Sequence, residues 1–255
     1  MTLVQCPRPF VHPEDTQPHW LRPYSRAAIT LFLTLAFPLS TLAGPLLICH
    51  AYDIGNAKSL PWAGSQWRDV QSNYDLNHLV DDTLSCLTPQ TSVIARMETI
   101  RRAMIYTEWA RVDHKVNYAP RNDNVTQNLF EKLKARADAA ERAGKPDALA
   151  IFDVGYFIES WRNSVGYRGQ TVPDVNGYEW VKRASALHHN DATMEFAAAL
   201  ITSIRSDKTA HQQHLQNAVA GATEGSLLSR NLVRLFPDRG QNLAELRASV
   251  GLAKR

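Results

Sequence analysis

Residues 93–105 have the sequence VIARMETIRRAMI, which predicts a helix with one apolar face. Apolar side chains recur every three or four residues, at Val93, Met97, Ile100 and Met104. This spacing places them on the same side of an α-helix. Glu98 and Arg102 lie one turn apart on the opposite side, where their opposite charges attract. We therefore expect an amphipathic helix that begins at Val93 and ends near Arg111.

The same periodicity continues along the rest of the chain from residue 75 onward. We expect further helices over residues 75–87, 124–143, 147–163, 175–187, 191–205, 208–220, 226–236 and 241–253. Glycine and proline separate several of these segments, as Gly144 and Pro146 do. We find no stretch with the alternating pattern of a β-strand. The sequence therefore predicts an all-α domain over residues 75–255, built from antiparallel helical hairpins.

Parts of this helical domain repeat. Residues 128–134 (NLFEKLK) match residues 176–182 (NGYEWVK) at an offset of 48, with asparagine, an aromatic, glutamate and lysine in the same places. Residues 147–152 match residues 191–196 at an offset of 44, through Asp-Ala and a later phenylalanine. Small residues that would let neighbouring helices approach closely stand at Gly155, Ala184, Ala198 and Ala218.

This pattern, over residues 125–236, resembles tetratricopeptide-type helical hairpins, whose repeats are ~34 residues long. The resemblance implies a short stacked array with a concave groove that binds a peptide or a partner protein. An irregular bundle of amphipathic hairpins would give much of the same pattern. Both architectures stay open at this point, and both are all-α.

An uncharged run covers residues 27–49 and follows two arginines, Arg22 and Arg26. Its first part is an apolar segment, and Thr41-Leu42-Ala43 then supplies the small residues that signal peptidases require. This order of charge, apolar segment and small residues is typical of a secretory signal peptide. We therefore expect residues 1–43 to be a signal peptide that is removed on export.

The same run also exceeds the ~20 residues needed to cross a bilayer, so an uncleaved N-terminal anchor over residues 27–49 is the alternative. Positive charge before the run orients a signal peptide and an anchor in the same way. In either case the body of the protein lies outside the cytoplasm, in a periplasm or secreted. A membrane contact is expected only through this run, and only if it is not cleaved.

Turn residues and aromatic residues alternate over residues 44–74, a segment too rich in glycine and proline for a long helix. We expect an extended arm whose aromatic side chains pack on the helical body. The alternative is a surface that binds a ligand through aromatic rings. The candidates for such binding are Trp62 and Trp67 in the arm, and Tyr156 and Trp161 in the helical domain.

Two cysteines follow the predicted signal peptide, Cys49 and Cys86. In an oxidising compartment they could pair and tie the arm to the first helix, although two separate buried thiols fit the sequence equally well. The formal net charge of the chain is only +3, and no basic block stands out. This balance argues against nucleic acid as a partner. We find no phosphate-binding loop and expect no cofactor.

One candidate for catalysis is the pair Glu159-Ser160 on a predicted helix. The pair resembles the Glu-Ser of lytic transglycosylases, which implies that Glu159 protonates a glycosidic oxygen. That role requires a carboxyl group in an apolar pocket, where burial raises its pKa. Trp161 and the residues just before the pair are apolar enough for such a pocket. A glutamate paired with a neighbouring arginine is the plainer alternative.

The candidate metal ligands are three histidines, of which His211 and His214 are one helical turn apart and His188 lies on the preceding hairpin. Imidazoles three positions apart face the same way, so they could converge on Zn²⁺. No paired cysteines or HExxH motif supports this site, and solvated histidines explain the pattern as well.

We therefore expect an exported, non-catalytic binding or scaffold protein for a peptide, a protein or a component of the cell envelope. This function predicts a concave face lined by alternate helices. The alternative is an extracytoplasmic hydrolase that acts on an envelope polymer. That function predicts a deep pocket in which Glu159, or the region of His188 and His211, joins other polar groups.

Overall fold

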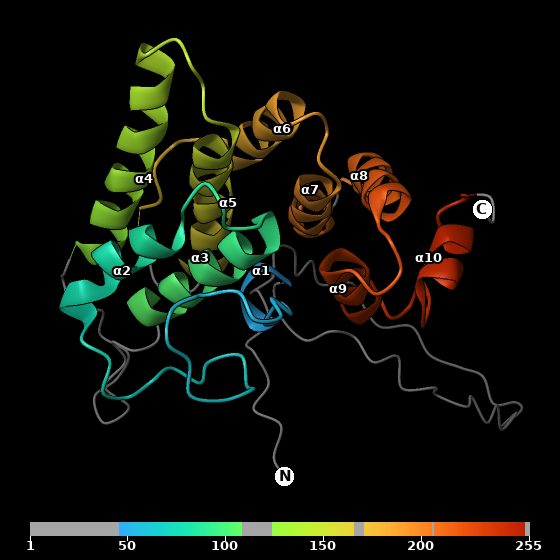
Figure 1. Ribbon diagram of the computed structural model, residues 1–255, viewed down its shortest axis with the longest axis horizontal. Coiled ribbons are helices and arrows are strands. Elements are labelled where there is room, and N and C mark those ends of the chain that lie inside the picture. The colour runs from blue at the N-terminus through green and yellow to red at the C-terminus, as the bar shows by residue number, and fades with distance from the viewer. Residues whose placement is uncertain (1–45, 109–123, 166–170, 206, 253–255) are drawn as a thin grey trace, which may run out of the picture.

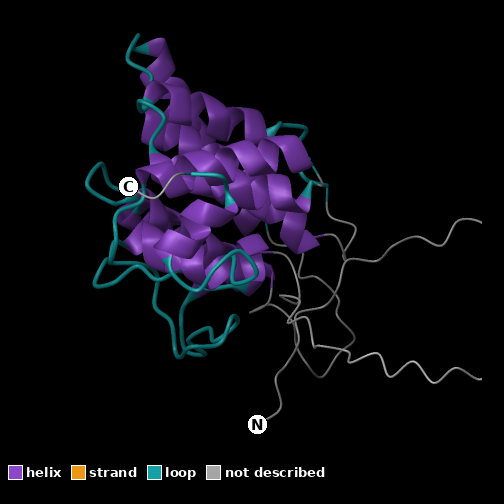
Figure 2. Ribbon diagram, turned by 90° about the vertical axis from the view of Figure 1, so that its right-hand side faces the viewer, coloured by secondary structure: helices purple, strands orange, loops and turns teal. Residues whose placement is uncertain are grey.

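The computed structural model describes residues 46–108, 124–165, 171–205 and 207–252, and every regular element in these ranges is helical (Figures 1 and 2). The elements are α1 (Leu46–Cys49), the 3₁₀ turn η1 (Leu76–His78), α2 (Leu79–Cys86), α3 (Val93–Glu108), α4 (Val125–Arg142), α5 (Ala148–Val165), α6 (Gly177–Leu187), α7 (Ala192–Ile204), α8 (Lys208–Gly221), α9 (Leu227–Leu235) and α10 (Leu243–Ser249). The all-α prediction is confirmed. None of the described helices is both long and apolar enough to cross a membrane.

The helices pack as a bundle with α5 and α7 near its centre (Figure 1). Helix α5 contacts α4 and α6, its neighbours in the chain, and α7 contacts α6 and α8 in the same way. Helices α1 and α3, from much earlier in the chain, also pack against both α5 and α7. These contacts between distant segments close the bundle around one core. The likeness to tetratricopeptide hairpins remains a prediction.

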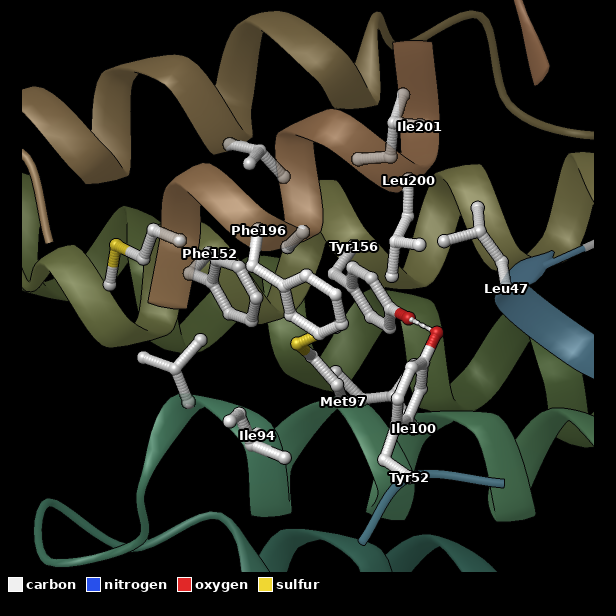
Figure 3. Close-up of a cluster of buried hydrophobic side chains, with 14 of the residues drawn as sticks. Leu47, Tyr52, Ile94, Met97, Ile100, Phe152, Tyr156, Phe196, Leu200 and Ile201 are labelled. Atoms are coloured by element: carbon white, nitrogen blue, oxygen red, sulfur yellow. Dashed lines mark hydrogen bonds between the residues drawn. The ribbon is translucent and has the colours of Figure 1, made fainter. Parts of the chain in front are cut away.

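Aromatic rings from three elements fill the middle of the core (Figure 3). The rings of Phe152 and Tyr156 on α5 stack with their centres 5.6 Å apart, and Phe196 on α7 meets Tyr52 edge to face at 6.3 Å. The hydroxyls of Tyr52 and Tyr156 lie 2.6 Å apart, and the Tyr52 hydroxyl also donates to the carbonyl oxygen of Leu46. Both polar groups are therefore satisfied although they are buried.

Helices α5 and α6 cross at two glycines. A Cβ added to Gly155 would lie 2.6 Å from the carbonyl oxygen of Gly177, and one added to Gly177 would lie 2.5 Å from that of Gly155. Real Cβ atoms do not approach backbone oxygens so closely, so the two helices can lie at this distance only because neither glycine has a side chain. Gly155 thus has the close-approach role that its small size predicts.

The arm, residues 50–74, has no regular structure and covers the charged side of α3. The Glu98 carboxylate accepts the backbone N–H of Tyr52 at 2.9 Å and the side chains of Arg101 and Arg102 at 2.8 and 2.7 Å. Arg101 in turn donates to the carbonyl oxygens of Ile48 and Trp67. The predicted Glu98–Arg102 pair forms, but Glu98 is fully buried. The cause is the arm, which converts the polar face of α3 into an interior surface.

The N-terminal part of the arm is also fixed to α9. The backbone N–H of Asp53 donates to the Asn231 amide oxygen, and the Asn231 amide nitrogen donates back to the Asp53 carbonyl, both at 2.8 Å. The Asp53 carboxylate pairs with Arg230 at 2.7 Å. The arm therefore bridges α3 and α9.

The cysteines do not form the pair Cys49–Cys86. Cys86 is a free, buried thiol on α2, and Cys49 belongs to a disulfide whose partner lies outside the described residues. The packing gives the reason, because α1 contacts α3, α5 and α7, whereas α2 contacts α3 and α4. The two cysteines therefore belong to different parts of the bundle.

The first described residues overlap the end of the run, residues 27–49, that could form a membrane anchor. Leu47, Ile48 and Cys49 are buried in the protein core. These residues belong to the folded body, so a membrane span over the whole of residues 27–49 does not fit the structure. The predicted signal peptide, residues 1–43, lies outside the described residues.

Replacing Gly155 with alanine tests the crossing of α5 and α6. Alanine is favoured over glycine within a helix by about 1 kcal/mol. The clash with α6 outweighs this gain, since overpacking costs about 1–3 kcal/mol. We expect Gly155→Ala to lower the free energy of unfolding, measured in urea. Gly177→Ala should cost less in the Gly155→Ala background than alone, because the helices have already separated. A stabilised Gly155→Ala protein would contradict the crossing.

His50 makes stability depend on pH. Burial, followed by the charges of Arg234 and Arg101, lowers the pKa of His50 to about 4. The unfolded chain binds a proton near pH 6.5, so the folded state loses stability as the pH falls from 6.5 towards 4. Burial raises the pKa of Asp153 to about 6, which acts in the opposite direction.

Comparison with His50→Gln isolates the histidine. Between pH 7 and pH 4.5 we expect the wild type to lose about 2 kcal/mol more than the variant in urea unfolding, which is less than the full pKa difference because the ring is partly solvated. Parallel pH dependences of the two proteins would show that His50 is not the titrating group.

Candidate binding groove

A groove of about 670 Å³ opens where several helices begin. The first turns of α3, α5, α7 and α9 contribute to it, together with the ends of α6 and α8. Apolar side chains, several of them buried, form its floor and include Val93, Ile94, Leu149, Leu227 and Leu228. Hydroxyl and amide groups form its rim and include Gln90, Thr91, Ser92, Thr193, Thr223 and Ser226. The first turns that line the groove thus come from alternate helices, and the intervening α6 and α8 contribute their ends.

Side-chain caps fix the positions at which these helices begin. The Asp191 carboxylate accepts the N–H groups of Thr193 and Met194 at the start of α7. Asp147 accepts two N–H groups at the start of α5, and Ser226 accepts one at the start of α9. Caps of this kind satisfy N–H groups that have no partner within the helix. The groove therefore offers hydroxyl and amide side chains to a ligand rather than a set of free backbone N–H groups.

A buried ion pair holds one wall of the groove. Arg96 on α3 and Asp153 on α5 pair at 2.5 Å, and both side chains are almost completely buried. The same guanidinium donates to the carbonyl oxygens of Thr88 and Thr91 in the loop before α3. Burial raises the pKa of Asp153 to about 6 against the opposing charge of Arg96, so the pair is charged at neutral pH. The loop that carries Gln90 is therefore fixed from beneath.

The described lining of the groove carries few charged groups. Its two titratable side chains are His188 and Asp191, whose ring nitrogen and carboxylate lie 3.4 Å apart. The remaining lining is apolar or carries hydroxyl and amide groups. A ligand that fits this surface presents apolar side chains to the floor and neutral hydrogen-bonding groups to the rim.

Glu159, the candidate acid, lies elsewhere in a structural ion pair. Its carboxylate is buried and accepts Nη1 of Arg162 at 2.8 Å and Nη2 of Arg205 at 2.7 Å. The same oxygen accepts the backbone N–H of Tyr178 at 3.2 Å. These bonds join α5 to α6 and to the end of α7. The plainer alternative, a surface glutamate paired with Arg162 or Arg136, is confirmed for the pairing with Arg162, but the side chain is buried rather than on the surface.

The three candidate metal ligands do not converge. His188 lies at the groove and pairs with Asp191, whereas Nδ1 of His211 lies 2.9 Å from the carbonyl oxygen of Ala199. His214 bonds instead to Glu195 on α7. Each imidazole thus has a different partner. In the part of the chain that the structure describes, no group of three histidine, cysteine or acidic residues is placed to hold a metal ion.

The aromatic binding candidates are core or arm residues. Tyr156 and Trp161 are at most 3% exposed. Trp62 is half-buried against Tyr106 at a ring distance of 6.0 Å, with the guanidinium of Arg101 5.2 Å from its ring. Trp67 also packs against the core. None of the four lines the groove.

The groove residues were not predicted from the sequence. Two of them, Asp191 and Ser226, are residue types that cap helices, and they stand at the starts of predicted helices. A capping residue, however, predicts only where a helix begins. Four such signals on alternate segments of an antiparallel bundle would have indicated that the helix starts share one end.

Comparison of the chain with protein-family models, with curated proteins and with solved structures finds no match in any of the three. The groove and the side chains around it are therefore the basis for inferring a function.

Proposed function

We propose that the protein is an exported helical binding protein whose groove holds a short, uncharged peptide segment of a partner protein. The observation that carries this proposal is the lining of the groove by alternate helices, with an apolar floor and a neutral polar rim. A hydrolase that acts on an envelope polymer is the alternative, and Glu159, its candidate acid, lies outside the groove.

The chemistry of the groove fits a peptide. Its volume of about 670 Å³ falls within the ~300–1,000 Å³ typical of small-ligand sites. Threonine and serine hydroxyls both donate and accept hydrogen bonds, as the peptide backbone requires. The leucines and the isoleucine of the floor accept aliphatic side chains. Since the groove is nearly neutral, a charged segment would lose its hydration without gaining an ion pair.

The walls of the groove are also fixed before a ligand arrives. The Arg96–Asp153 pair holds the loop before α3, and side-chain caps hold the other helix starts. Binding to such a site costs little conformational entropy. This preorganisation favours recognition of short segments, which make few contacts.

The position of α1 supports export with cleavage. Leu47 and Ile48 are fully or almost fully buried in the core, four residues and five residues after Ala43. These buried residues thus lie close to the predicted signal-peptidase site. Removal of residues 1–43 would leave the packing of Leu47 and Ile48 against the described core in place, although it would separate Cys49 from its disulfide partner.

A charge placed in the groove tests peptide binding. We expect Leu227→Lys to raise the Kd for uncharged hexapeptides with blocked ends about tenfold or more, because the ammonium group disrupts the apolar floor of the groove. The measurement is fluorescence anisotropy with a labelled peptide library rich in valine, leucine, serine and threonine. The matched control is Leu187→Lys, which replaces a leucine that is 42% exposed and lies outside the groove.

The control should bind as the wild type does. If no peptide in the library binds, or if the two lysine variants bind equally well, the groove is not a peptide site.

Export is tested by N-terminal sequencing of the protein recovered from an extracytoplasmic fraction of cells that express the full chain. We expect the sequence to begin at Gly44, directly after the predicted cleavage site. Recovery of the protein in the membrane pellet with Ala27 still present would replace the signal peptide with an anchor. Recovery only from the cytoplasm would contradict export.

A further inference from the structure

A chain of three polar side chains links α6, α7 and α8 outside the groove. The Glu195 carboxylate lies 2.8 Å from Nδ1 of His214, and Nε2 of His214 lies 2.7 Å from the Tyr178 hydroxyl. The same carboxylate accepts two further hydrogen bonds, from the Ser185 hydroxyl at 2.7 Å and from the Asn217 amide at 2.9 Å. Carboxylate, imidazole and hydroxyl thus follow one another in a line.

The chemistry of Glu195 decides where the proton of His214 lies. Burial acts to raise the pKa of Glu195, but the hydrogen bonds from His214 and the two other donors outweigh it and keep that pKa below its usual value. An ionised carboxylate only accepts, so Nδ1 of His214 carries the proton. Nε2 is then free to accept the Tyr178 O–H. This is the relation between base and nucleophile in a catalytic triad.

Charged side chains of both signs surround Tyr178. Nζ of Lys182 lies 5.1 Å from the centre of the ring, and the guanidinium carbon of Arg205 lies 5.5 Å from it. Lys182 is paired with Glu179, and Arg205 is paired with Glu159.

Burial raises the pKa of Tyr178, and the charge of Lys182 acts in the opposite direction. The carboxylates of Asp207, Glu179 and Glu195 raise the pKa further. Tyr178 is only partly buried, and the His214 side chain is 13% exposed. The hydroxyl therefore depends on a base to remove its proton.

We propose that Tyr178 is a nucleophile, activated by His214 and positioned through Glu195, that takes an acyl group from a carboxylic ester. The Tyr178 oxygen attacks the ester carbonyl carbon while Nε2 of His214 takes the hydroxyl proton. The bond from that carbon to the alcohol oxygen breaks, and His214 returns the proton to the departing oxygen. Water then attacks the acyl carbon while Nε2 of His214 takes a proton from the water. The bond from that carbon to the Tyr178 oxygen breaks, and His214 returns the proton to the Tyr178 oxygen as the carboxylic acid leaves.

A second tyrosine provides an internal comparison. The Tyr74 hydroxyl donates directly to the Asp82 carboxylate at 2.7 Å, without an imidazole between them. Tyr74 is also half-buried and contacts another aromatic ring, Tyr106. It therefore shares the burial and the carboxylate of the Tyr178 site but lacks its base, and Tyr74→Phe is the matched control variant.

The test is the reaction of the purified protein with p-nitrophenyl acetate. We expect a burst of nitrophenolate and an acetyl group on the peptide that contains Tyr178, located by mass spectrometry. Tyr178→Phe should abolish the burst, because phenylalanine lacks the oxygen that is acetylated. His214→Gln should lower the burst rate about hundredfold, the size of a general-base contribution. Tyr74→Phe should react as the wild type does. Circular dichroism spectra and melting temperatures check that each variant is folded.

The pH profile separates a base from a structural contact. The burst rate of the wild type should be lower at acid pH than at neutral pH, because a general base must be free to accept the hydroxyl proton, and His214→Gln should abolish that dependence. Glu195→Gln should reduce the rate while Tyr178 remains the acetylated residue. Acetylation of lysines alone, or acetylation of Tyr178 at an unchanged rate in His214→Gln, would overturn the proposal. The peptide-binding groove is tested by other variants, so either result stands without the other.

Discussion

The buried carboxylate of Glu98 is the constraint on which the N-terminal half of the body depends. It lies inside the protein with two arginine side chains and one backbone N–H as donors. Removing one partner of such a cluster costs about 3–5 kcal/mol, because the remaining charges stay buried without compensation. The backbone of the arm meets this cluster at Tyr52 and Trp67. The arm and the charges of α3 are therefore parts of one unit.

Helix α3 also stabilises one wall of the groove through a buried charge. Arg96, one and a half turns before Arg101, pairs with Asp153 and fixes the loop that precedes α3. Helix α3 thus carries buried charges on two sides, one below the arm and one beside the groove. Its interior position results from elements that are distant in the sequence.

Much of the fold was predictable from the sequence because helix ends are local features. Asn176, Asp191, Asp207 and Ser226 each cap the helix that follows, and the predicted bounds of these helices lie within two residues of those observed. The site was not predictable in the same way. Glu159 has a partner in Arg205, 46 residues away at the end of α7, and His214 has a partner in Glu195, 19 residues away on α7. Periodicity carries no information about such pairs. The burial of Glu98 likewise requires knowledge of where the arm lies.

The bond between the arm and α9 determines the order in which the body closes. Asp53 and Asn231 are 178 positions apart, and the contact forms only when almost the whole chain is present. Closing so long a loop is slow, since its entropy must be lost before the contact gives anything in return. During synthesis from the N-terminus, the arm can meet α3 as soon as that helix is made, whereas its bond to α9 cannot form until α9 is present. The arm is thus made early, and its bond to α9 is among the last of its contacts to form.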